Sequence, residues 1–282
     1  MKARRVLVVT DGADDDLRAL ALLDAAPEVA IDAVVATSGS LWMDEAKQRL
    51  TELAVGPVYD GLPECVHASR AAARAEYRGA FDRPLPPARR VHTHLLPRRA
   101  SPPTVLLLAP ATVLAHWLEA KQAAYLGPVF VFAGALAVPG NATSRAEFNA
   151  WFDPPALEAL LAAGLDLTLL PLDALGDLAW DRQWLTEFSA LQTPLAAQLT
   201  EMLAAKLERR PRLPLWDEAL VLSLIAPEVV ARRERRALAV DADGALIDAS
   251  DRRKPITVIT GLDFAACHAA VKRLCGPGTA DA

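Results

Sequence analysis

The sequence is poor in cysteine and has no long apolar run. Its three cysteines, Cys65, Cys267 and Cys275, are an odd number without metal-site spacing, which indicates a reducing compartment and incidental thiols. No stretch approaches the ~20 apolar residues that cross a bilayer. The first apolar run stops at Asp11, which makes it shorter than a signal peptide requires. We therefore expect a cytoplasmic protein without a membrane segment.

The sequence also lacks an excess of positive charge. It has 30 Lys and Arg against 35 Asp and Glu, a net charge of −5, and no basic stripe of the kind that binds nucleic acid. Hydrophobic residues make up 52% of the 282 residues, which is enough for a sizeable core. We expect a single globular domain over residues 1–282, with residues 276–282 as a disordered tail, and no nucleic-acid partner.

Short β-branched or leucine-rich runs alternate with longer alanine-rich segments along the chain. The runs lie at residues 6–10, 33–37, 105–109, 129–132 and 167–172. Helical patterns such as WMDEAKQRLTELA and PPALEALLAAG stand between them. This alternation predicts an α/β fold with a mostly parallel central sheet and helices on both faces. Ligands of such sheets bind at the carboxyl ends of the strands.

The carboxyl end of the first expected strand carries a dense group of acidic residues. Residues 6–23 read VLVVTDGADDDLRALALL, with aspartates at 11, 14, 15 and 16. Asp caps free N–H groups at a helix N-terminus and suits the helix dipole, but one or two aspartates satisfy that need. Like charges at this spacing raise one another's pKa unless a cation or hydrogen-bond donors compensate. The surplus therefore indicates a bound cation or a polyhydroxy ligand.

Two other aspartate-rich patterns match this loop poorly. An EF-hand loop starting at Asp11 needs Gly at its sixth position and Glu at its twelfth, where the chain has Asp16 and Leu22. A haloacid-dehalogenase-type phosphotransferase has a second acid two residues after its nucleophile, whereas a glycine and an alanine follow Asp11. That second alternative stays open only through Asp14 and Asp16.

A second polar segment, GALAVPGNATSRAEFNAWFDP, occupies residues 134–154, just after the expected strand at 129–132. Asn141, Glu147 and Asn149 offer donors and acceptors to several hydroxyl groups, as recognition of a sugar requires. Asp153 followed by Pro154 is typical of a helix N-terminus. A helix start explains the end of the segment but leaves GNATSRAEFN unexplained, which favours a sugar-binding loop.

These segments together resemble the inosine-uridine preferring nucleoside hydrolase family. That family has D-x-D-P-G-x-D-D near its N-terminus and G-N-x-T-x-x-x-E-F-N followed by D-P-E-A in its middle, where this chain has GNATSRAEFNAWFDPPA. Further blocks follow in family order: APATVLA at 109–115, FAGA at 132–135, PLDAL at 171–175 and WDEALVLSLIAPEV at 216–229. The resemblance covers almost the whole chain. It implies the nucleoside hydrolase fold, a small-molecule nucleoside as partner, and a homodimer or homotetramer.

The resemblance implies a Ca²⁺ ion held by the aspartate loop and the C-terminal block. Alignment without gaps makes Asp11 both a metal ligand and the general base, and Asp16 and Asp217 the other metal carboxylates. The backbone carbonyl of Thr112 supplies a neutral oxygen, and Asp15 binds ribose hydroxyls. Oxygen ligands of this kind suit Ca²⁺, and the cation would offset the repulsion among the aspartates.

The loop departs from the family pattern at several positions. Val9 replaces the first aspartate, and Ser40 replaces the asparagine of a G-N pair. Ala13 replaces a glycine, and because Ala tolerates positive φ poorly, the loop could slide by one residue. In that case the roles in the loop would pass to Asp14 and Asp15.

The implied reaction is hydrolysis of the N-glycosidic bond of ribonucleosides. Water deprotonated by Asp11 attacks C1′, while nearby carboxylates stabilise an oxocarbenium-like ribosyl cation. The middle block supplies the other substrate-binding residues, which are Asn141, Glu147, Phe148 and Asn149.

The position that many family members use to protonate the leaving base holds a different residue here. Many members place His immediately before the C-terminal aspartate as a proton donor, but this chain has Trp216. Tryptophan is no acid at neutral pH, and the purine-preferring branch of the family stacks the base on tryptophan. We therefore expect Trp216 to stack on the base and favour purine nucleosides, with a purely packing role as the alternative.

Two further candidates lie between residues 77 and 94. Tyr77-Arg78-Gly79 aligns loosely with a family loop that contributes to base binding, and its role stays open. His92 and His94 would share one face of an extended segment, but arginines flank them and no third ligand is near. We expect a solvated loop there and no zinc site.

Two functions from different classes follow. The first is a Ca²⁺-dependent N-ribosyl hydrolase that releases free base and ribose, with purine nucleosides favoured. The second is a non-catalytic or weakly active ribosyl-binding relative, which has lost turnover through the replacements at positions 9, 40 and 216. Asp11, Asp16 and Asp217 favour the enzyme, because a scaffold has no need of mutually repelling carboxylates.

Overall fold

A computed structural model of the chain describes residues 3–61, 101–249 and 253–277. Within these ranges the helices are α1 (Asp14–Asp24), α2 (Met43–Leu53), α4 (Thr112–Glu119), α5 (Phe148–Phe152), α6 (Pro154–Ala162), α7 (Arg182–Ser189), α8 (Pro194–Arg209), α9 (Asp217–Ile225) and α10 (Phe264–Cys275), with 3₁₀ turns η1 (Ala123–Tyr125), η2 (Leu172–Ala174) and η3 (Pro227–Val229). The strands are β1 (Arg4–Thr10), β2 (Val29–Ala36), β3 (Val58–Asp60), β4 (Thr104–Leu107), β5 (Val129–Phe132), β6 (Leu167–Leu170), β7 (Ala179–Asp181), β8 (Arg212–Pro214), β9 (Val230–Arg236), β10 (Leu238–Val240), β11 (Leu246–Asp248) and β12 (Ile256–Leu262).

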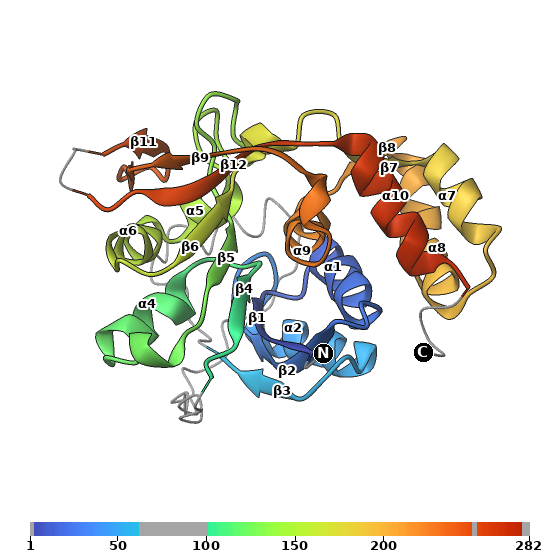
Figure 1. Cartoon of the computed structure of the whole chain (residues 1–282), viewed down its shortest axis with the longest axis horizontal. Helices are drawn as coiled ribbons and strands as arrows, with labels where there is room; N and C mark the ends of the chain where they lie inside the picture. Colours follow the sequence, from blue (N-terminus) through green and yellow to red (C-terminus); the bar gives the residue numbers. More distant parts are fainter. Residues whose placement is uncertain (1–2, 62–100, 250–252, 278–282) are drawn as a thin grey trace.

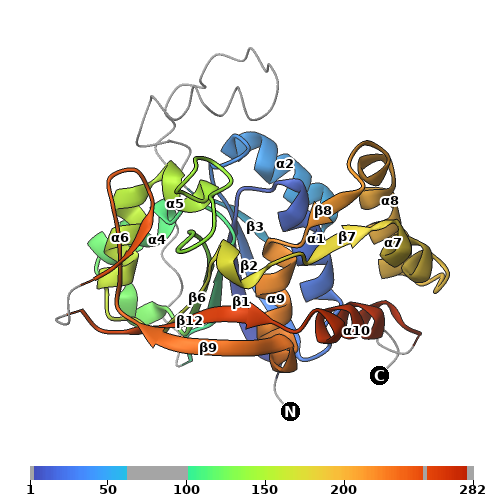
Figure 2. The same ribbon diagram turned by 90° about the horizontal axis from the view of Figure 1, so that it is seen from above.

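The described strands form one eight-stranded sheet in the order β3-β2-β1-β4-β5-β6-β12-β9 and two small two-stranded sheets. All pairs of the large sheet are parallel except β12 with β9. Helices cover both faces, with α4 and α6 on one side and α1 and α9 on the other (Figures 1 and 2). The predicted α/β class with a mostly parallel central sheet is confirmed.

The alternation of side chains along β1 divides the core into two layers. Val6 and Val8 are fully buried against α1, α2 and α9, whereas Leu7 and Val9 point to the layer that contains α4 and α6. Because both faces are covered, the central strands are apolar throughout. Val9, which stands where the family has an aspartate, is therefore part of the second core.

The topology places a crevice at the carboxyl edge of the sheet. From β1 the chain runs outward through β2 to β3, and from β4 it runs outward the other way through β5 to β6. Helix α1 after β1 and helix α4 after β4 cover opposite faces. Neighbouring strands that diverge in this way leave room for a ligand beyond their carboxyl ends. The aspartate loop follows β1 at this point.

One edge of the sheet was not anticipated by the apolar pattern. β9 reads VARRERR and is mostly exposed, yet it pairs with β12 in an antiparallel ladder. An edge strand keeps charged side chains in solvent while its backbone pairs on one side only. The described helices include none that is long and apolar enough to cross a membrane.

Candidate active site

A cavity of about 390 Å³ lies at the carboxyl edge of the sheet, within the size range of ligand sites. Every residue assigned to the site from the sequence lines it except Thr112. The lining residues are Asp11, Ala13, Asp14, Asp15, Asp16, Arg18, Ser40, Leu108, Phe132, Asn141, Glu147, Phe148, Asn149, Lys206, Arg209, Arg210, Leu213, Pro214, Trp216 and Asp217. Tyr77, Arg78, Gly79, His92 and His94 lie outside the described residues.

The backbone of the aspartate loop explains how the chain tolerates an alanine in it. The residue with positive φ is Gly12, at +68°, while Ala13 has an ordinary φ of −64°. A Cβ on Gly12 would also lie 2.9 Å from the Cα of Ala46. Glycine therefore stands where the turn needs it, and no strain at Ala13 calls for a slide of the loop.

The aspartates do not cap helix α1 in the usual way. The N-cap residue is Ala13, and no side chain caps this N-terminus. The three aspartates that follow, Asp14, Asp15 and Asp16, occupy the first turn, where the helix dipole favours negative charge. Simple capping therefore does not account for the acidic group.

Asp11 is buried and held in place by the two segments around it. The backbone N–H of Ser40 donates to its Oδ2 at 2.5 Å, and that of Ala13 donates to its Oδ1 at 3.3 Å. Burial raises the pKa of Asp11 to about 6 despite these hydrogen bonds. The carboxylate thus has a fixed orientation among the residues that line the cavity, and its pKa lies closer to neutral pH than that of an exposed aspartate.

Three carboxylates converge beside Asp11. One oxygen from each of Asp15, Asp16 and Asp217 lies within 4.8 Å of the other two. Burial raises the pKa of Asp16 and of Asp217 well above the usual range, and the charges of neighbouring aspartates, Asp11 among them, raise both further. The Oδ1 atom of Asp217 is buried and has no hydrogen-bond partner in the described part of the chain. Repulsion and an unpartnered oxygen together fit a site for a cation.

Asp14 has a different environment. Its side chain pairs with Arg49 at 2.5 Å and also with Lys206. Burial alone would raise the pKa of Asp14, but these two cations lower it to about 2. Asp14 is therefore neutralised by basic residues. The carboxylates that approach Asp217 are those of Asp15 and Asp16, whereas the alignment without gaps predicts that Asp11, Asp16 and Asp217 share the ion, with Asp15 on the ribose.

Thr112 does not line the cavity with its side chain. It is the first residue of α4, and its hydroxyl donates to Asp153 Oδ2 at 2.6 Å. Asp153 in turn caps α6 by accepting from the backbone of Ala156, as the Asp-Pro sequence predicts. The role of the Thr112 carbonyl stays a prediction.

The second polar segment reaches the cavity through its E-F-N residues. Glu147 caps α5, and its carboxylate accepts hydrogen bonds from the backbone of Asn149 and Gly134 at 2.8 Å and of Ala150 at 3.1 Å. Burial nevertheless raises the pKa of Glu147 to about 7. Phe148 is buried, and Asn141 Oδ1 accepts from its backbone N–H at 2.8 Å.

Asn149 joins this segment to the sheet. Its side-chain amide nitrogen donates to the carbonyl of Phe132 at 3.1 Å and to that of Leu108 at 3.4 Å. Phe132 ends β5 and Leu108 directly follows the neighbouring strand β4, so both carbonyls lie at the carboxyl edge of the sheet, and together they fix the amide orientation. The side-chain oxygen of Asn149 is then the atom available to a ligand hydroxyl.

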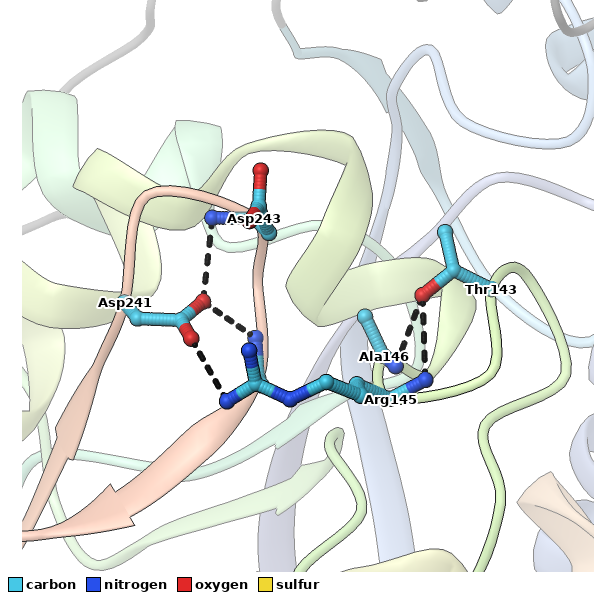
Figure 3. Close-up of polar contacts among 6 residues, drawn as sticks. Thr143, Arg145, Ala146, Asp241 and Asp243 are labelled. Carbon is cyan, nitrogen blue, oxygen red and sulfur yellow. Dashed lines mark hydrogen bonds and ion pairs between the residues drawn. The ribbon is translucent and has the colours of Figure 1, made fainter.

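A hairpin from the C-terminal part of the chain holds the same segment from outside (Figure 3). Arg145 donates to Asp241 Oδ2 at 3.0 Å, while Asp241 Oδ1 accepts from the backbone of Asp243 and Ala245 in the turn between β10 and β11. The hydroxyl of Thr143 accepts from the backbone of Arg145. The loop is therefore fixed locally and through a contact distant in sequence.

Trp216 closes another wall of the cavity. It is half-buried at the N-terminus of α9, directly before Asp217, and it packs against the core. Its exposure to the cavity leaves the indole able to stack on a ligand ring, so the position is consistent with both the stacking role and the packing role.

The basic residues of the site were not predicted from the sequence. Arg18 is buried, and its Nε donates to Glu218 Oε1 at 2.5 Å; the indole of Trp180 donates to the same oxygen at 2.8 Å. A charged residue in an apolar helix face was the available signal for Arg18. The run KLERRPR at 206–212 was the signal for the others that line the cavity, Lys206, Arg209 and Arg210.

The fold and the cavity define an α/β protein whose carboxylates suit a cation and whose asparagines and Glu147 suit a sugar. A sequence model of the inosine-uridine preferring nucleoside hydrolases matches residues 6–269. The pyrimidine-specific ribonucleoside hydrolase RihA of Salmonella enteritidis is 23% identical over 256 residues, which cover 82% of each chain.

Solved structures agree in fold. A plant nucleoside hydrolase superposes with a TM-score of 0.79 and 19% identity, covering 98% of this chain and 99% of that chain. A purine-preferring ribonucleoside hydrolase from Gardnerella vaginalis gives a TM-score of 0.76 and 18% identity, covering 98% and 100%. The chain belongs to the inosine-uridine preferring nucleoside hydrolase family and is an N-ribosyl hydrolase.

Proposed function

We propose that this chain hydrolyses the N-glycosidic bond of ribonucleosides in a Ca²⁺-dependent reaction, with purine nucleosides favoured. The observation that carries the proposal is the convergence of Asp15, Asp16 and Asp217 within 4.8 Å in the cavity that Asn141 and Glu147 also line. A cluster of this kind supports the proposal because it could hold a cation beside the loop that we expect to bind the sugar.

The residues fit the implied ion. Asp16 and Asp217 would hold it, joined by Asp11 and the carbonyl of Thr112, and Asp15 would bind the ribose diol beside it. All are oxygen donors, which Ca²⁺ prefers. When bound, the ion supplies positive charge that stabilises the ionised carboxylates and makes a nearby water more acidic.

Asp11 acts as the general base in this proposal. Its buried carboxylate accepts the proton of the attacking water while the oxygen of that water bonds to C1′. Hydrogen bonds from Ser40 and Ala13 hold the carboxylate in one orientation during the transfer. Positioned bases of this kind accelerate reactions by typically ~10²–10⁴-fold.

The ribose is bound on the opposite wall. The oxygen of Asn149, fixed by the two donations of its amide group, accepts a ribose hydroxyl, and Glu147 has lone pairs left beyond its three backbone contacts. Charge developing on the sugar ring is stabilised by Asp15 and its neighbours. The leaving base stacks on Trp216.

A nucleoside panel tests the proposal. Free ribose is measured from inosine, adenosine, guanosine, uridine and cytidine with the protein stripped of metal and with Ca²⁺ restored. We expect purine turnover that needs Ca²⁺ and a loss of ~10²-fold or more in Asp11→Asn. Ribose release that does not depend on Ca²⁺ would contradict the role of the metal. Nucleoside binding without ribose release would support the non-catalytic alternative. Cytoplasmic location and a dimer or tetramer stay predictions.

A further inference from the structure

One wall of the cavity is cationic. Lys206, Arg209 and Arg210, which we call the cationic rim, come from the end of α8 and the residue after it. The chain then passes through β8 to Trp216, so the rim and the indole belong to one segment. Every charged residue that this segment, 206–216, contributes to the lining is basic.

Two of the three rim residues have no ion-pair partner among the described residues. Lys206 is paired with Asp14. Arg209 and Arg210 are exposed, and their side chains make no ion pair or hydrogen bond to the described residues. The negative end of a helix favours basic residues, which accounts for their position after α8. It does not account for the fact that both line the cavity.

The position of the cationic rim indicates that it would contact the base of a bound nucleoside and not the sugar. The proposed sugar ligands Asn141, Glu147 and Asn149 come from the segment after β5, whereas the rim continues into the residue that would stack on the base. Arg18, buried in the wall between α1 and α9, uses only Nε for Glu218. No hydrogen bond to a described residue involves its two Nη groups, so these N–H donors are available to the cavity.

We propose that the cavity takes ribosides whose leaving base carries a carboxylate, with Arg209 and Arg210 as its specificity-determining residues. The inference rests on the proposed function and extends its substrate class to N-ribosylated heteroaromatic acids. Guanidinium groups bind carboxylates through paired, charge-assisted hydrogen bonds, and a flat acid stacked on Trp216 would direct its carboxylate at the rim.

A pyridinium riboside suits this site chemically as well. Water adds to C1′, the C1′–N bond breaks with its electron pair going to the ring nitrogen, and the water proton passes to Asp11 and then to solvent. The products are ribose, a neutral pyridine ring bearing its carboxylate, and one proton. The ring nitrogen needs no proton donor, which agrees with Trp216 in the place of an acid.

Two ribosides that differ in a single group form the test. Nicotinate riboside carries the carboxylate, and nicotinamide riboside carries an amide at the same ring position. We expect kcat/KM to be about tenfold or more higher for the nicotinate compound. The ratio should fall toward one in R209M/R210M and in high salt, and stay unchanged in R212M, a neighbouring arginine that does not line the cavity.

Equal rates on the two ribosides in the unaltered protein, or a ratio that survives in R209M/R210M, would overturn the inference. A preference for inosine 5′-monophosphate over inosine that the double variant abolishes would also overturn it, because the rim would then serve a phosphate. Calorimetry with free nicotinate and free nicotinamide measures their binding affinities, and so tests the contribution of the rim without turnover. If nicotinate binds more tightly than nicotinamide and R209M/R210M removes the difference, the inference is supported even when no riboside is cleaved. The absence of cleavage would then contradict the proposed function and not the inference.

Discussion

Gly39 faces the carboxylate of Asp11 so closely that a side chain cannot fit between them. A Cβ at Gly39 would lie 2.0 Å from Asp11 Oδ2 and 2.7 Å from its Cβ. The next residue, Ser40, donates its backbone N–H to that same oxygen. The orientation of the proposed base therefore depends on a glycine from the segment after β2.

Gly39→Ala should displace Asp11 and lower kcat by ~10²-fold or more, because the proposed base leaves its position. Thermal unfolding should show that the fold persists. Gly56→Ala is the control, since its added methyl group meets the side chain of Ile31 at 3.2 Å and neither residue lines the cavity. Equal activity of Gly39→Ala and the unaltered protein would contradict the role of Asp11.

Asp217→Asn should weaken Ca²⁺ binding, because it removes one ionised carboxylate from a cluster of three and leaves an amide beside the ion. Calorimetry with Ca²⁺ measures the effect without substrate, and a loss of at least ~10-fold in affinity is expected. Asp24→Asn, at the exposed end of α1, should bind Ca²⁺ normally. Retained affinity in Asp217→Asn would place the ion elsewhere.

The stability of the metal-free protein should fall as pH rises from about 4 to 7. Burial raises the pKa of Asp11 to about 6 and that of Glu147 to about 7, above their unfolded values of about 3.9 and 4.3. In this window the folded state binds more protons than the unfolded state, so raising the pH favours unfolding. Each kcal/mol lost should lower Tm by about 2–4 °C.

One variant and the ion check that pH dependence. Glu147→Gln is neutral at every pH and should flatten the upper part of the decline. Ca²⁺ binds the ionised carboxylates, so adding it at pH 7.5 should raise Tm and reverse the trend. A metal-free Tm that climbs through this window would show that these carboxyl groups are not destabilised by burial.

Trp216→Ala should lower kcat for inosine by about tenfold, in line with the loss of an aromatic contact in the transition state. Hydrolysis of p-nitrophenyl riboside should change little, because its leaving group needs no activation. Trp216→Phe should recover part of the loss. If kcat falls alike for both substrates, Trp216 supports the pocket only by packing.

Much of the fold and of the candidate site could be predicted from local sequence. Apolar runs alternating with helical segments predicted the parallel sheet, and the order of the motif blocks predicted the family. The aspartates of the first loop and the E-F-N residues were found because each group is contiguous in sequence. A charged edge strand such as β9 was missed, because its pairing with β12 leaves no apolar signal in its own residues.

The sequence by itself determined which side chains are candidates for the chemistry, because residue type and local periodicity are properties of short segments. Tertiary structure decided which of them meet. The packing of α1 against α8 and α9 brings Asp16 to Asp217, Arg18 to Glu218 and Lys206 to Asp14, while Asp11 depends on a glycine after a different strand. Contacts between residues some 200 positions apart form only when the buried surfaces of distant segments pack together. A pattern within a single segment therefore cannot predict them.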